Sequence, residues 1–281
     1  MFQRELRSNR SGVRRSEEHD ETNERFVMRP EFITMHTNSL HTDRMRHFQQ
    51  AGLYLVTSQA LSCGRTTLEI VDAALAGGVR LIQLREKEMP VPDFWRLAGQ
   101  IRARTARAGA LLIINDRLDV ALAVGADGVH LGQADFPIAP ARQLAPDLII
   151  GASTHSPAEA RAAEQAGASY LNIGPLFPTR TKTWPGEFLG LEGLSAIARL
   201  VTLPWTVMGG IKKAHIPDLL KAGARTIAVV TAVTAAADPA QAARELLALL
   251  RQQPAVKGPR PNFRRARGKT GAITRGRNPA G

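Results

Sequence analysis

Eight short runs rich in β-branched and apolar residues alternate along this chain with alanine-rich stretches of helical period. The runs cover residues 53–57, 79–85, 110–116, 128–132, 148–153, 170–174, 204–210 and 226–232. Strands that alternate with helices are typical of parallel sheets built from βα units. Eight such units are what a closed parallel barrel needs, so the sequence predicts an α/β fold of the (β/α)₈ TIM barrel class.

The stretches between the runs carry the start and stop signals of helices. Several end at an Ala-Gly pair, in which glycine stops the helix: Ala76-Gly77, Ala108-Gly109, Ala166-Gly167 and Ala222-Gly223. We expect the helices to begin near Arg65, Val91, Leu118, Ala139, Pro157, Leu191, Ala214 and Pro239. An open doubly wound sheet is the alternative architecture, and the lack of a G-x-G-x-x-G pattern after the first run speaks against it.

The two ends of the chain differ from its middle. Residues 1–50 show no sustained period and few aliphatic residues, which predicts a disordered or loosely structured extension. Residues 254–281 combine proline, glycine and arginine, which predicts a disordered basic tail. The barrel is then a single domain over residues 51–253, and a chain of these residues alone should keep any activity.

The distribution of net charge along the sequence indicates whether the protein binds polyanions such as nucleic acid. The formal charge is +12, but residues 254–281 carry eight basic and no acidic side chains, whereas residues 51–253 carry 20 basic and 17 acidic ones. The predicted barrel therefore has no general affinity for polyanions, and nucleic acid is an expected partner of the tail at most.

Other compositional signals concern the compartment. We find no apolar run long enough to cross a membrane, and the charged first residues do not resemble a signal peptide. Cys63 is the only cysteine, so the chain has no internal disulfide. We expect a cytoplasmic enzyme without membrane partners, and the sequence is compatible with a homo-oligomer.

Polar residues gather where the predicted strands end. In a (β/α)₈ barrel the active site lies at the carboxyl ends of the strands. The second run ends in Gln83, Arg85 and Lys87, which alternate and so point to one side of an extended segment. The ends of the other runs, and the loops after them, add Asn115, Asp116, His130, Asp135, Ser153, the segment Pro-Thr-Arg-Thr-Lys at 178–182, Gly209, Gly210, Val230 and Thr231.

This set combines groups that bind phosphate with groups that repel it. Cations, hydroxyls and glycine-exposed amides suit phosphate oxygens, while Asp116 and Asp135 do not. One Mg²⁺ ion held by the two carboxylates would resolve the conflict, because Mg²⁺ commonly binds one or two carboxylates together with substrate phosphate. Arg85, Lys87 and Lys182 would then balance a diphosphate, and the glycine pair with the amides after the eighth run would hold a monophosphate.

Several of these residues also fit simpler roles. Asn115 and Asp116 could cap the helix expected near Leu118. Arg85 and Lys87 could belong to a surface charge cluster with the neighbouring glutamates, and His130 could be an interior histidine. We expect His155 to serve the turn before the next helix, and Trp184 to be a packing residue.

Six segments resemble the thiamine phosphate synthase (thiamine-phosphate pyrophosphorylase) family in order and spacing, over about residues 52–250. They are LYLVT, GGVRLIQLREK, IINDRLDVALAVGADGVHLGQAD, IIGASTHS, YLNIGPLFPTRTK and GGI. The resemblance implies a transferase that joins an aminopyrimidine methyl diphosphate to a thiazole phosphate with one Mg²⁺, by dissociative substitution.

The resemblance also implies a role for each matching residue. The diphosphate would contact Arg85, Lys87, Asn115 and Lys182, and the Mg²⁺ ion Asp116 and Asp135. The thiazole phosphate would contact Ser153, Thr179, Thr181, Gly210, Val230 and Thr231, and the pyrimidine Gln83 and His130. Arg85, Ser153 and Lys182 would act as catalytic residues.

The chain departs from the family pattern at a few positions. Ser58, Met208 and His215 stand where Asp, Ile and Asn are common, and residues 183–189 continue the 178–182 loop in an unusual way. Two other functions stay open. A thiazole tautomerase of the same superfamily would need neither diphosphate nor Mg²⁺, and a binding protein would use the basic tail to reach RNA or an acidic partner.

Overall fold

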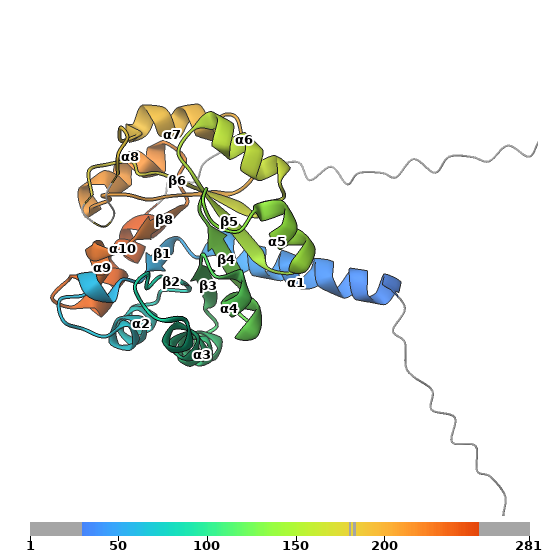
Figure 1. Ribbon diagram of the computed structural model, residues 1–281. Helices are drawn as coiled ribbons and strands as arrows, with labels where there is room; N and C mark the ends of the chain where they lie inside the picture. The colour runs from blue at the N-terminus through green and yellow to red at the C-terminus, as the bar shows by residue number, and fades with distance from the viewer. Residues whose placement is uncertain (1–29, 180, 182–183, 253–281) are drawn as a thin grey trace, which may run out of the picture.

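The computed structural model describes residues 30–179, 181 and 184–252, with side chains from residue 39 onward. Its strands form one closed parallel barrel (Figure 1). Each strand pairs with the next, and β1 closes the barrel against β8 through Leu53 and Ile227. The predicted (β/α)₈ fold is confirmed. The strands are β1 Leu53–Val56, β2 Leu81–Leu84, β3 Leu111–Asn115, β4 Gly128–Leu131, β5 Ile149–Thr154, β6 Tyr170–Ile173, β7 Trp205–Val207 and β8 Thr226–Val229.

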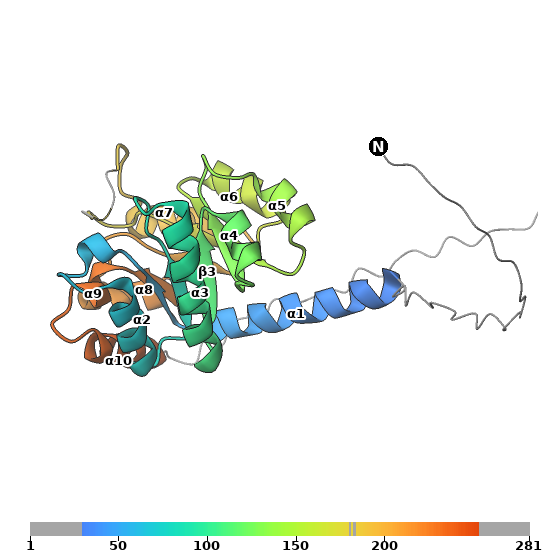
Figure 2. The ribbon, with the colours of Figure 1, turned by 60° about the horizontal axis from the view of Figure 1, so that its bottom comes forward.

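Helices surround the barrel (Figures 1 and 2). They are α1 Pro30–Gln50, α2 Thr67–Ala76, α3 Val91–Arg107, α4 Leu118–Ala123, α5 Ile138–Leu144, α6 Pro157–Gln165, α7 Gly190–Ala198, α8 Ile216–Lys221, α9 Thr231–Thr234 and α10 Pro239–Arg251, with short 3₁₀ turns at Gln59–Leu61 and Lys213–His215. Among the described residues, none of these helices has the length and apolar character needed to span a bilayer.

Local sequence explains where the helices start and stop. The side chains of Thr66, Ser156 and Asp238 accept hydrogen bonds from the first-turn amides of α2, α6 and α10. After α3, α6 and α8 the chain turns at a glycine with positive φ, as the Ala-Gly pairs predict. After α2 the left-handed residue is Gly78 rather than Gly77, so the stop comes one residue later than expected.

Two predicted strands end three residues earlier than expected. The run at 204–210 forms a strand only to Val207, because Gly209 and Gly210 adopt φ values of +97° and +64°, which an extended strand cannot contain. The run at 226–232 ends at Val229, and α9 follows directly. Both changes place tight backbone turns at the carboxyl end of the barrel.

Packing occurs in two layers. One apolar cluster fills the space between the strands and the outer helices, and a second fills the inside of the barrel. The inner cluster contains Tyr54, Ile113, Ile149 and Tyr170, and it also includes Phe48 from α1. The amino-terminal helix is therefore part of the barrel core.

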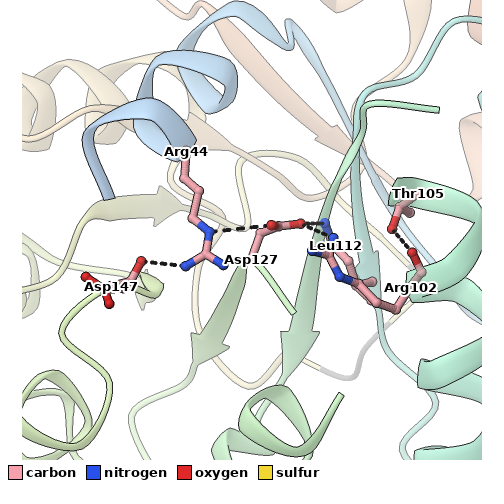
Figure 3. Close-up of polar contacts among 6 residues, drawn as sticks. All are labelled: Arg44, Arg102, Thr105, Leu112, Asp127 and Asp147. Atoms are coloured by element: carbon pink, nitrogen blue, oxygen red, sulfur yellow. Dashed lines mark hydrogen bonds and ion pairs between the residues drawn. The ribbon is translucent and has the colours of Figure 1, made fainter. Parts of the chain in front are cut away.

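Helix α1 differs from the expected disordered or loosely structured extension over residues 1–50. Its last turns lie at the amino ends of the strands, where Phe48 is 1% exposed. Arg44 pairs with Asp127, at 3.4 Å, and donates to the carbonyl of Asp147 at 2.9 Å, while Arg102 approaches Asp127 from the opposite side at 2.9 Å (Figure 3). The earlier part of α1 extends away from the barrel (Figure 2).

The sequence pattern missed the packing of α1 because of the composition of the helix face that contacts the barrel. Its contacts come from His41, Arg44, Met45 and Phe48, which have helical spacing but are half polar. A search for apolar residues at helical spacing does not find a face of this kind. The boundary expected at residue 51 thus falls inside a packed unit, and the tail expected over residues 254–281 lies outside the described residues.

Candidate active site

A cavity of about 950 Å³ opens at the carboxyl ends of the strands. It brings together nearly the whole predicted set, from elements across the barrel. The lining includes Gln83, Arg85, Lys87, Asn115, Asp116, His130, Asp135, Ser153, Thr179, Thr181, Gly210, Val230 and Thr231. Lys182 lies outside the described residues.

Strand β2 delivers an amide and two cations to this cavity. Gln83 is buried in the strand, and Arg85 and Lys87 follow it at alternate positions, as the sequence predicts. Between them, Glu86 points the other way and accepts hydrogen bonds from the hydroxyls of Thr57 and Thr67, both at 2.8 Å. Glu86 is thus bound to the β1 loop and α2 and forms no surface cluster with the two cations.

Two carboxylates face this cationic arm. Asp116 adopts the left-handed conformation at φ +62°, and its carboxylate lies 3.0 Å from the Nζ atom of Lys87. Asp135 accepts a hydrogen bond from the amide of Gly132 at 2.7 Å. Burial raises the pKa of the Asp135 carboxyl, and its contact with the carboxylate of Asp116 raises this pKa further.

That arrangement fits a divalent cation. Two adjacent carboxylates, one of them partly desolvated, repel each other unless a proton or a cation lies between them. Asp116 does not cap the following helix, since the residue at the N-cap of α4 is Arg117 and no side chain caps that end. The capping alternative for Asn115 and Asp116 is therefore wrong.

His130 lies at the floor of the cavity and is almost completely buried. Its Nδ1 atom is 2.8 Å from the hydroxyl of Tyr170, and its Nε2 atom is 3.0 Å from the Oγ atom of Ser153. Burial lowers the pKa of His130 to about 4. The imidazole is therefore neutral at physiological pH and is both an interior histidine and a cavity residue.

The opposite end of the cavity is built by tight loops. A Cβ atom at Gly210 would overlap the carbonyl oxygen of Pro178, so the loop after β7 packs directly against the loop that carries Thr179 and Thr181. The hydroxyls of these two threonines lie 3.2 Å apart. Thr231, the first residue of α9, completes this end.

Sequence reasoning missed several lining residues, four of which carry a charged or aromatic side chain. Lys212 adds a cation next to Gly210, and His155, Trp184 and Phe188 form part of the cavity wall. The rings of His155 and Trp184 are 4.5 Å apart. The expected roles of His155 in a turn and of Trp184 in packing are thus incomplete, and the sequence offers no periodic signal that would have placed either side chain in the cavity.

Comparison with known proteins agrees with this geometry. Residues 53–233 match the family model described as thiamine monophosphate synthase. The chain is 46% identical over 204 residues to the thiamine-phosphate synthase of Chloroflexus aurantiacus, covering 73% of this chain and 94% of that protein. It is 48% identical over 198 residues to the thiamine-phosphate synthase of Moorella thermoacetica, covering 70% and 94% respectively.

Solved structures are similar to this chain at two levels, the family and the fold. A thiamine phosphate pyrophosphorylase from Pyrococcus furiosus superposes with a TM-score of 0.67 at 41% identity, covering 72% of this chain and 96% of that one. A 3-hexulose-6-phosphate synthase superposes with a TM-score of 0.54 at 22% identity, which reflects the shared barrel fold.

Proposed function

The chain belongs to the thiamine monophosphate synthase family and is a transferase that makes thiamine phosphate, and we propose that it does so in the cavity at the carboxyl ends of the strands. In this proposal an aminopyrimidine methyl diphosphate and a thiazole phosphate are the two substrates. Their phosphate groups occupy opposite ends of the cavity, and their rings meet between them.

The charge distribution of the cavity supports this division. Arg85, Lys87 and Asn115 bind the diphosphate together with Lys182, whose neighbours in the loop line the same cavity. Thr179, Thr181, the turn at Gly210 and the backbone at Val230 and Thr231 bind the thiazole phosphate, and Ser153 contributes its hydroxyl. Gln83 and His130, on the floor, face the pyrimidine.

Asp116 and Asp135 are the proposed ligands of one Mg²⁺ ion. The supporting observation is the contact between the two carboxylates together with the raised pKa of Asp135, which a cation would reverse. When bound, the ion would supply positive charge to the diphosphate leaving group. Lys87, 3.0 Å from Asp116, orients this carboxylate and adds charge on the same side.

In the proposed reaction the bond between the pyrimidine methylene carbon and the diphosphate oxygen breaks first. The electron pair leaves with the diphosphate, whose charge Arg85, Lys87 and Lys182 stabilise. The thiazole nitrogen then donates its lone pair to the methylene carbon and forms the new C–N bond. The residues of the chain contribute positioning and electrostatic stabilisation, as suits a reaction without a covalent enzyme intermediate.

One observation carries the proposal: the cationic arm of β2 and the carboxylate pair lie in the same cavity as a separate, tightly built loop site. A protein that bound only a thiazole phosphate would need the loop site alone. It would leave Arg85 and Lys182 without a substrate anion and Lys87 with only the carboxylate of Asp116, at a cost in mutual repulsion among the cations.

The direct test is to supply both substrates with Mg²⁺ and to measure diphosphate and thiamine phosphate together. The two should appear in equal amounts. Isomerisation of a thiazole precursor without metal, and no thiamine phosphate, would instead favour the tautomerase alternative.

A Lys182→Ala variant sharpens the test. Loss of one cation from the diphosphate clamp should lower kcat by a factor that corresponds to about 2–4 kcal/mol of barrier, by analogy with the loss of one oxyanion donor. The KM for thiazole phosphate should change little. Lys221→Ala, an exposed lysine that pairs with Asp218, is the control and should behave like the unaltered protein.

The setting of the enzyme is also part of the proposal. We propose a cytoplasmic enzyme with a catalytic domain within residues 39–253, since α1 packs into the barrel. Its partners are the two small-molecule substrates, and residues 254–281 are not required for catalysis. Activity measured on a chain that ends at residue 253 tests this assignment.

A further inference from the structure

A chain of hydrogen bonds runs beneath the floor of the cavity. Gln83 Nε2 lies 2.7 Å from the hydroxyl of Tyr54, which lies 2.9 Å from the hydroxyl of Tyr170. Tyr170 in turn bonds His130 at 2.8 Å, and His130 bonds Ser153 at 3.0 Å. Gln83, His130 and Ser153 line the cavity, whereas the two tyrosines are fully buried and are the only tyrosines in the sequence.

The donor at one end fixes the direction of the whole chain. An amide nitrogen only donates, so the hydroxyl oxygen of Tyr54 accepts from Gln83. Tyr54 then donates its proton to Tyr170, and Tyr170 donates to Nδ1 of His130. A neutral imidazole whose Nδ1 accepts carries its proton on Nε2, so His130 donates to the Oγ atom of Ser153. With the bonds in this direction, the hydroxyl proton of Ser153 is available to a ligand in the cavity.

The surrounding barrel holds the tyrosines in this arrangement. A Cβ atom at Gly151 would overlap the phenol of Tyr170, so this position on β5 makes room for the ring. The ring of Phe48 from α1 also packs against Tyr170, with 4.3 Å between the two ring centroids. The tyrosines therefore have little freedom to form other hydrogen bonds.

We propose that Tyr54 and Tyr170 are positioning residues that set the imidazole tautomer of His130 and thereby present Ser153 to the substrates as a hydrogen-bond donor. The same chain holds the Gln83 amide, so the pyrimidine contact and the serine contact are linked through the barrel interior. This inference rests on the proposed roles of Gln83 and Ser153 in the cavity. In this arrangement Ser153 does not act as a nucleophile, because an imidazole that donates to its hydroxyl cannot take its proton.

The first test needs no catalysis. In the full chain with nitrogen-labelled histidine, proton–nitrogen NMR correlations distinguish the protonated ring nitrogen from the unprotonated one, and the spectrum of His130→Gln assigns the signal. We expect the proton on Nε2 at neutral pH, and the same in Tyr54→Phe, where Tyr170 still donates. In Tyr170→Phe this preference should be lost.

The second test uses the KM values of the two substrates to distinguish the Gln83 end of the hydrogen-bond chain from the Ser153 end. Tyr54→Phe should raise the KM for the pyrimidine diphosphate about tenfold while the KM for thiazole phosphate stays within about twofold, because Gln83 loses its acceptor, whereas Tyr170 loses only the bond from Tyr54 and still donates to His130. Tyr170→Phe should raise both. Thr206→Val is the matched control, since it removes a buried barrel hydroxyl that has no hydrogen-bond partner.

Two results would overturn the inference. A proton on Nδ1 of His130 in the unaltered protein would mean that the hydrogen bonds run in the opposite direction. KM values in both phenylalanine variants equal to those of Thr206→Val would mean that the tyrosines are only packing residues. If Tyr170→Phe does not fold, Tyr54→Phe and the NMR measurement decide alone. Absence of thiamine phosphate synthesis would count against the proposed function. The NMR measurement of the His130 tautomer would still test the direction of the hydrogen bonds.

Discussion

At the scale of single residues, Asp116 and Asp135 are two carboxylates that lie together in the cavity. Asp116→Asn and Asp135→Asn should each raise the Mg²⁺ concentration needed for half-maximal activity and lower kcat at saturating substrates. The unfolding temperature should change little, because asparagine preserves the volume and tolerates the left-handed backbone of Asp116. Activity titrated against Mg²⁺ measures the effect.

Asp218→Asn is the control for this pair, because Asp218 forms an exposed ion pair with Lys221 on α8. It should titrate like the unaltered protein. Normal turnover of both cavity variants at limiting Mg²⁺ would mean that the metal ligands lie elsewhere.

His130 makes stability depend on pH. Its pKa is about 4 in the folded protein and near 6.5 in the unfolded chain. Between these values the unfolded chain binds the proton more readily, so the free energy of unfolding should fall as pH decreases from 6.5 towards 4, by about 3 kcal/mol over the whole window. Urea unfolding at several pH values measures the slope, which should be smaller in His130→Gln. An equal slope in both proteins would mean that His130 does not contribute.

At the scale of elements, the loops after β6 and β7 form one unit because glycine lets them meet. Gly210→Ala should raise the KM for thiazole phosphate and lower stability, since the new methyl group would overlap the carbonyl of Pro178 and alanine is strained at φ +64°. Gly190→Ala isolates the backbone effect: this glycine has φ +57° with nothing within 4 Å of the added Cβ.

The alanine at position 190 should cost about 1–2 kcal/mol, the penalty for a left-handed residue, and should leave the KM unchanged. Thermal unfolding and steady-state kinetics of both variants make the comparison. If Gly210→Ala binds thiazole phosphate normally, the loop does not form the phosphate site.

At the scale of the whole molecule, α1 closes the amino end of the barrel. The patterning of residues 1–50 predicts that a chain of 51–253 keeps its activity, but the structure leads to a different expectation. Without residues 39–50, the inner core loses Phe48, and Asp127 loses Arg44. The shorter chain should therefore unfold at a lower temperature than a chain of 39–253, and it should lose activity as it unfolds.

Phe48→Ala tests the same contact within the full chain. Truncation of a buried phenylalanine should lower the free energy of unfolding by about 3 kcal/mol. Leu40→Ala, on the same helix at 46% exposure, should change it by less than about 0.5 kcal/mol. Equal stability of the two variants, measured by chemical denaturation, would show that α1 does not support the barrel.

The sequence by itself determined the barrel and most of the candidate site. Alternation of period two placed Gln83 of β2, and Arg85 and Lys87 directly after it, on one side of the chain. Parallel strands bring their carboxyl ends to one face, so local pattern and topology were sufficient. The end of β7 was not determined by the sequence, because a glycine pair after an apolar run can extend a strand or turn it.

Only the tertiary structure decided which distant residues meet. Tyr54 and Tyr170 look like ordinary core residues in the sequence, and their hydroxyls join only because barrel closure brings strands 116 residues apart to face each other. The docking of α1 depends in the same way on Asp127 and Asp147, which lie far along the chain from Arg44. Periodicity records which side chains turn inward, whereas the partner of each one depends on the register and closure of the barrel, and no local segment contains that information.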